Sequence, residues 1–121
     1  NEQIDVEFAA KILKDIIPQR KPVPITIDLI QEKVSNHYKI NISELKSKKR
    51  NRSIAFPRQI AMYLSRELTD ASLPTIGSKF GGRDHTTVIH ACEKISKEIL
   101  KNPALKEEIE HLKNQITKLS S

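Results

Sequence analysis

Apolar residues recur every three or four positions along most of the chain, which is the spacing of one face of an α-helix. Prolines, glycines and short polar runs interrupt this pattern and mark where helices end. The predicted helices cover residues 5–17, 26–37, a short turn from 43, 54–69, 73–80, 85–100 and 103–119. We therefore expect an all-α fold, a bundle of helices.

Three prolines separate the first predicted helix from the rest of the chain. They are Pro18, Pro22 and Pro24. Proline removes a backbone donor and disfavours helix before it, so we expect a stiff linker over residues 18–25. Residues 1–25 then form a connecting segment and residues 26–121 the main domain, in which Thr26 can cap the first helix.

The stretch beginning at Ser72 has the signals of two helices joined by a tight turn. Ser72 is a favoured N-cap residue, and Pro74 falls in the first turn that follows it. Gly81 and Gly82 stop this helix, since glycine readily takes the left-handed backbone found just past a helix end. Asp84 can cap the next helix. A helix, a glycine turn and a capped second helix form the helix-turn-helix pattern.

The helix predicted from residue 85 separates into an apolar and a polar side at about 100° per residue. The apolar side, expected to face the core, carries Val88, Cys92, Ile95 and Ile99. The polar side carries Thr86, His90, Lys94 and Lys97, with Thr87 at its edge. Short hydrogen-bonding side chains at the amino end of a helix suit contact with base edges in a DNA major groove.

Two other helices are predicted to have distinct sides. In the helix over 54–69, Pro57 is expected in the first turn, where a missing N–H is tolerated. One side of that helix carries Ile60, Leu64 and Leu68, and the opposite side carries Arg58, Met62 and Arg66. The last helix, after the cap pair Asn102 and Pro103, repeats Leu105, Ile109, Leu112, Ile116 and Leu119. This repeat spans about two heptads, so packing on its own domain is favoured over a dimer seam.

The charge of the chain is concentrated in one segment. The net charge is +6 and the pI is about 9.5. Residues 41–68 carry seven cations against two anions, a net +5, and SKKRNRS at 47–53 has four cations in seven residues. This exposed basic segment predicts an acidic partner such as nucleic acid, with a solvated loop as the alternative.

Composition limits the other classes of function. The single cysteine excludes an internal disulfide framework and fits a reducing compartment. No apolar run approaches the roughly 18–20 residues of a membrane span, and the amino end lacks a signal-peptide pattern. We expect a soluble, cytoplasmic protein associated with the nucleoid. The five Phe and Tyr residues are too sparse for a base-stacking platform that binds single strands.

Catalytic and metal chemistry are disfavoured by spacing. His85 and His90 lie five positions apart, whereas a helical metal pair prefers four. Asp84 and His85 are neighbours that point about 100° apart on a helix, and no nucleophile accompanies them. Cys92 falls on the core side and is expected to be structural. We therefore expect no enzyme activity and no metal.

One string carries a resemblance to a known family. SLPTIGSKFGGRDHTTVIHA (72–91) and the continuation to residue 95 resemble the signature of the bacterial chromosomal replication initiator family, DnaA. RNRSIAFPRQIAMYLSRELT (50–69) resembles the basic loop and following helix of that family. The resemblance covers about residues 26–120, the DNA-binding domain, and residues 5–17 resemble the last helix of a preceding AAA+ lid.

The resemblance implies a monomeric reader of short, asymmetric DnaA boxes in the replication origin, with a recognition helix in the major groove and a basic loop in the minor groove. The DNA-binding residues carried over by motif are Lys48, Lys49, Arg50, Arg52, Arg58, Gln59, Arg66, Pro74, Arg83, Asp84, His85, Thr86, Thr87, His90 and Lys94. Among them, Arg50 is implied to enter the minor groove and Arg66 to contact phosphate. Some relatives carry a cation where this chain has Phe56, so that contact is expected to be missing.

The roles implied for the remaining residues divide between bases and backbone. Those implied at base edges are Asp84, His85 and Thr86, with Pro74 near a thymine. Those implied at phosphate or the groove wall are Thr87, His90 and Lys94. Arg58 and Gln59 are implied to contact bases or backbone, and Arg58 has the fork that pairs with guanine. For Asp84, a plain N-cap and an acceptor for a cytosine amine both stay open.

The same resemblance sets expectations for cofactors and other partners. No GxxxxGK[ST] string is present, so no cofactor is expected here, and ATP with Mg²⁺ is expected in an AAA+ domain outside this sequence. Acidic phospholipids are a possible partner of the helix at 5–17, for which docking on the lid is an alternative. Protein regulators of initiation are further implied partners.

Two other functions remain as alternatives. A transcription regulator with the same helix-turn-helix would bind palindromic sites as a stable dimer. A basic helical adaptor would grip an acidic protein and show no preference among DNA sequences.

Overall fold

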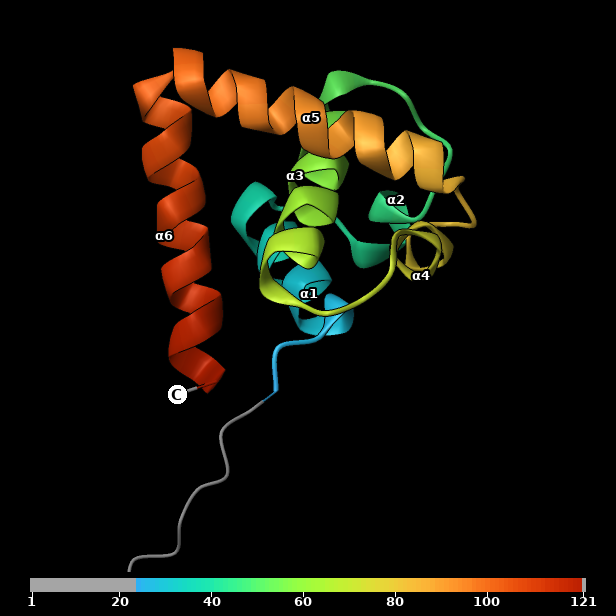
Figure 1. Cartoon of the computed structure of the whole chain (residues 1–121), viewed down its shortest axis with the longest axis horizontal. Coiled ribbons are helices and arrows are strands. Elements are labelled where there is room, and N and C mark those ends of the chain that lie inside the picture. The colour runs from blue at the N-terminus through green and yellow to red at the C-terminus, as the bar shows by residue number, and fades with distance from the viewer. Residues whose placement is uncertain (1–23, 121) are drawn as a thin grey trace, which may run out of the picture.

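The computed structural model describes residues 24–120, and this part of the chain is built of α-helices without strands (Figure 1). The helices are α1 (Ile27–Tyr38), α2 (Ile42–Leu45), α3 (Arg52–Leu68), α4 (Leu73–Lys79), α5 (His85–Lys101) and α6 (Pro103–Ser120). The all-α prediction is confirmed. The helix predicted at 5–17, its possible lipid contact and most of the proline linker lie outside the described residues.

Helix α3 lies at the centre of the bundle, where α1, α2, α4 and α5 all pack against it. Its Ile60 and Leu64 are fully buried, as predicted. Arg58 and Met62, which were predicted on the opposite side, are buried as well. A helix covered by neighbours around most of its circumference has no single apolar face.

The start of α3 also differs from the prediction. The helix begins at Arg52, inside the segment expected to be loop, so Pro57 lies in the second turn and not in the first. The Asn51 carbonyl accepts from the N–H groups of Ile54 and Ala55 at 2.9 and 2.8 Å, which fixes this earlier start. Residues 46–51, which we call the basic loop, then join α2 to α3.

The helix-turn-helix prediction is confirmed in α4 and α5. The Ser72 hydroxyl accepts from the Thr75 N–H at 3.3 Å and caps α4. Gly81 and Gly82 follow with φ of 90° and 77°, the left-handed values that glycine adopts at low cost. The N–H groups of Gly82 and Arg83 return to the Gly77 carbonyl at 3.1 and 2.9 Å, which closes the turn before α5 begins.

Helix α6 packs on α1 and α5 and completes the core. Its buried residues are Leu105, Ile109, Leu112 and Ile116. The expectation that this helix packs on its own domain is confirmed for these four. The Asn102 side chain accepts from the N–H groups of Ala104 and Leu105 at 3.1 and 3.3 Å, as a cap before Pro103.

The ends of the described chain lie on one side of the molecule. In Figure 1 the described chain begins below α1 and ends at the lower end of α6, whereas the amino end of α5 lies at the right. Over residues 24–120, no helix combines the length and apolar character needed to cross a bilayer.

Candidate nucleic-acid interface

A hollow of about 430 Å³ brings together the basic loop, the start of α3 and the helix-turn-helix. It is lined by Lys48, Arg50, Ala55, Arg58, Gln59, Gly81, Gly82, Arg83 and Thr87. These residues come from three segments of the sequence. The fold therefore places the cationic loop beside the amino end of α5.

The polar side of α5 is exposed as predicted. Its exposed residues include His85, Thr86, Thr87, His90, Lys94 and Lys97. Val88, Cys92 and Ile95 are buried on the other side. Thr87, His90 and Lys94 also border a second hollow of about 240 Å³ next to α3. The outer side of α5 thus runs as a polar strip along the flank of α3.

Asp84 is the N-cap residue of α5, but its side chain makes no capping hydrogen bond. Its backbone is extended, with φ −63° and ψ 151°, and its side chain is exposed. Because the carboxylate makes no capping contact, the N-cap interpretation explains only the backbone position. Acceptance of a hydrogen bond from a base stays a prediction.

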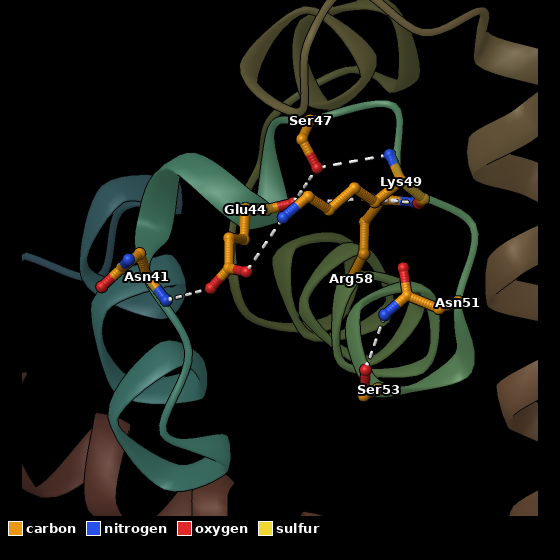
Figure 2. A network of polar contacts seen from close by, with 7 residues as sticks. All are labelled: Asn41, Glu44, Ser47, Lys49, Asn51, Ser53 and Arg58. Atoms are coloured by element: carbon orange, nitrogen blue, oxygen red, sulfur yellow. Dashed lines mark hydrogen bonds and ion pairs between the residues drawn. The ribbon is translucent and has the colours of Figure 1, made fainter.

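Arg58 is buried, with 6% of its surface exposed, and its guanidinium lies on protein carbonyls (Figure 2). Its Nε donates to the Leu45 carbonyl at 3.0 Å. One terminal nitrogen donates to the carbonyls of Lys49 and Glu44 at 2.8 and 3.4 Å. Burial and the nearby positive charge of Arg83 lower its pKa. The expectation that Arg58 presents a fork to guanine therefore differs from this placement, in which the fork binds carbonyls of α2 and of the basic loop.

Arg83 makes similar contacts from the turn before α5. One terminal nitrogen donates to the Ser47 carbonyl at 2.8 Å, and the other donates to the Phe80 carbonyl. The side chain is half-buried, and burial lowers its pKa. Main-chain carbonyls have no sequence signal, so these two arginines cannot be distinguished from exposed ones by composition.

The other cations of the basic segment are exposed. Lys49 pairs with Glu44 at 3.4 Å, and Glu44 also accepts from the Asn41 N–H at 3.0 Å (Figure 2). That backbone hydrogen bond is the main cause of the lowered pKa of Glu44, and Lys49 adds to it. Lys48, Arg50 and Arg52 are exposed as well. The predicted exposure of the basic segment is confirmed.

The position of Phe56, where some relatives are expected to carry a cation, is covered by the guanidinium of Arg52. The Arg52 guanidinium lies 4.5 Å from the centroid of the Phe56 ring, within the range of a cation–π contact. The resemblance to the family had predicted no positive charge at this position. The structure places the charge of Arg52 directly over it.

The remaining predicted residues lie around the same face or near it. Gln59 lines both hollows, and its Oε1 is buried without a hydrogen-bond partner in the described structure. Pro74 is exposed in the first turn of α4. Arg66 is exposed farther along α3, beside another hollow of about 420 Å³ between α3 and α5. Cys92 is buried there, and burial raises the pKa of its thiol.

Comparisons with known proteins agree with this geometry. A family model described as "Bacterial dnaA protein helix-turn-helix" matches residues 27–95. A crystal structure of a DNA replication initiation factor is similar at 35% sequence identity, with a TM-score of 0.71 over 78% of this chain. The match covers 29% of that protein, so the present chain spans less than a third of its length. Because the family model covers more than half of the residues, this chain belongs to the bacterial dnaA protein helix-turn-helix family.

Proposed function

We propose that this domain binds double-stranded DNA sequence-specifically at DnaA boxes of the replication origin and so brings the initiator to the origin. The amino end of α5 occupies the major groove, and the basic loop reaches the adjacent minor groove. The observation that carries this proposal is the common hollow, which the cationic loop and the first turn of α5 both border.

Helix α5 has the chemistry that base reading needs. Its first three residues are exposed and include His85 and Thr86, directly after Asp84. A major groove about 12 Å wide admits a helix, and threonine offers both a hydroxyl and a methyl that packs on thymine. The free N–H groups at a helix amino end favour a phosphate nearby.

The basic loop and its neighbours supply the contacts with the backbone and the minor groove. Arg50 is exposed at the rim of the hollow, and a narrow A·T-rich minor groove attracts arginine through its enhanced negative potential. Lys48, His90 and Lys94 lie around the same face and are assigned to phosphates. This arrangement explains why the charge of the chain is concentrated between residues 41 and 68.

The domain is proposed to bind as a monomer and without a cofactor of its own. A single helix-turn-helix with an added loop reads an asymmetric site, so no twofold partner is needed. Sedimentation of the complex should give one chain per box, and a chelator should leave the affinity unchanged. A stable dimer on palindromic DNA would instead support a transcription regulator.

The main test is binding of the 121-residue chain to a labelled duplex from its own origin, in competition with a scrambled duplex across a salt series. Specific sites typically exceed non-specific DNA by about 10³-fold or more, and we expect a preference of that order. Equal binding to both duplexes would overturn the proposal and favour the adaptor function.

A matched pair of variants tests the role of the loop. Arg50→Ala and Lys101→Ala each remove one exposed cation, but Lys101 lies at the far end of α5. We expect Arg50→Ala to reduce the preference for the box and Lys101→Ala to leave it unchanged. Equal effects would mean that only total charge matters.

A further inference from the structure

The backbone of the basic loop is held by side chains from α3 and from the turn before α5. Three alternate carbonyls at the end of α2 and in the loop accept from arginines: Arg58 binds those of Leu45 and Lys49, and Arg83 binds that of Ser47. Arg58 comes from α3 and Arg83 from the turn before α5. Two elements that are distant in sequence therefore hold the same short segment.

The glycine turn lies directly against the same segment. A Cβ atom added at Gly81 would lie 2.2 Å from the Lys46 carbonyl oxygen, far inside contact distance. The loop and the turn are thus in backbone contact, with no side chain between them. This close approach fixes where the loop begins relative to the first residue of α5.

We infer that Arg58 and Arg83 are positioning residues, which hold the basic loop at a fixed distance from α5 so that Arg50 and the first turn of α5 reach one duplex together. The inference rests on the proposed function. It assigns to Arg58 a role through the loop backbone, in place of direct contact with a base.

The chemistry of arginine explains why lysine would not serve at these positions. A guanidinium presents five donors in a rigid fork, and Arg58 uses Nε and one terminal nitrogen on different carbonyls. Lysine keeps the charge but has one flexible nitrogen, and it cannot span carbonyls of Leu45 and Lys49 in the same geometry. A charge contact with phosphate would largely survive this change, whereas a positioning role would not.

The test is a double-mutant cycle for box binding with Arg58→Lys and Arg50→Ala. Loss of a buried, charge-assisted set of hydrogen bonds is expected to weaken binding by about tenfold or more in the wild-type background. In the Arg50→Ala background most of this effect should disappear, because the loop has lost the side chain that it positions. Lys94→Gln, which removes an exposed cation of α5, should instead add its effect to that of Arg50→Ala.

Hydrogen exchange of the free protein gives an independent readout. Arg58→Lys should accelerate exchange of the loop amides at 46–51 while the amides of α5 keep their protection. Arg83→Lys, at a less buried site, should produce the same pattern if Arg58→Lys does not fold. Additive effects of Arg58→Lys and Arg50→Ala, or unchanged loop exchange, would overturn the inference. If the wild type shows no preference for the box, the proposed function fails, and the exchange result alone decides whether the arginines hold the loop.

Discussion

Gly77 in α4 lies directly against the backbone of the following turn, and its replacement by alanine gives a sharp test of the fold. A Cβ at this residue would lie 2.1 Å from the carbonyl oxygen of Arg83 and 3.5 Å from a methyl of Val88. The same turn is hydrogen-bonded to Gly77, because the N–H groups of Gly82 and Arg83 donate to the Gly77 carbonyl. The turn cannot move away without weakening those bonds.

The expected change in the free energy of unfolding combines opposing effects. Alanine is favoured over glycine inside a helix by about 0.8–1.0 kcal/mol. Overpacking typically costs about 1–3 kcal/mol, and each turn hydrogen bond that is lost costs about 0.5–1.5 kcal/mol more. We therefore expect Gly77→Ala to destabilise the domain by about 1–4 kcal/mol. For a domain of about 100 residues, each kcal/mol lowers Tm by about 4–8 °C.

Urea unfolding followed by the circular dichroism of the helices measures this change. Ser78→Ala, at the exposed neighbouring position, serves as the matched control and should stay within about 0.5 kcal/mol. Gly82→Ala distinguishes the effect of a steric clash from that of backbone strain. A Cβ added at Gly82 would have no atom within 4 Å, but the φ of this residue is +77°. Its expected cost is about 1–2 kcal/mol, from left-handed backbone alone. A Gly77→Ala protein as stable as the wild type would refute the close approach of α4 to the turn.

Three further predictions concern binding and pH. Thr86→Ala should reduce the preference for the box sequence while weak non-specific binding remains, which competition with scrambled DNA measures. An equal loss of affinity for both duplexes would show that Thr86 contacts only the DNA backbone. Arg66→Ala should weaken binding to all sequences alike and reduce the slope of log affinity against log salt by about one unit, and an unchanged slope would remove Arg66 from the phosphate contacts. Stability should fall as pH rises above about 9, because burial raises the pKa values of Cys92, Tyr38 and Tyr63 above their ordinary 9.0, 10.0 and 10.0, so the unfolded chain loses these protons first. Urea unfolding at pH 8 and pH 10 measures the loss, and equal stability at both would contradict it.

The elements that sequence predicts best are those with local chemical signals. Ser72 and Asn102 cap helices where expected, because a short polar side chain can accept from N–H groups two or three residues later. Gly81 and Gly82 end α4 for an equally local reason, their positive φ. The exposed side of α5 follows from helical periodicity and needs no knowledge of its neighbours.

Two features of α3 were not predicted from the sequence. Pro57 suggested a later start for α3, but the Asn51 carbonyl closes the first turn at Arg52 and the missing proline donor is tolerated in the second. The burial of Arg58 could not be predicted, because the partners of its guanidinium are backbone carbonyls, which every residue type carries and no pattern reveals.

The placement of both ends of the described chain beside α1 and α6 has a practical consequence for experiments. The carboxyl end of α6 and the start of α1 lie away from the first turn of α5 (Figure 1). A fluorescent fusion, or a sensor surface attached through residue 120, therefore leaves the approach of a long duplex unobstructed.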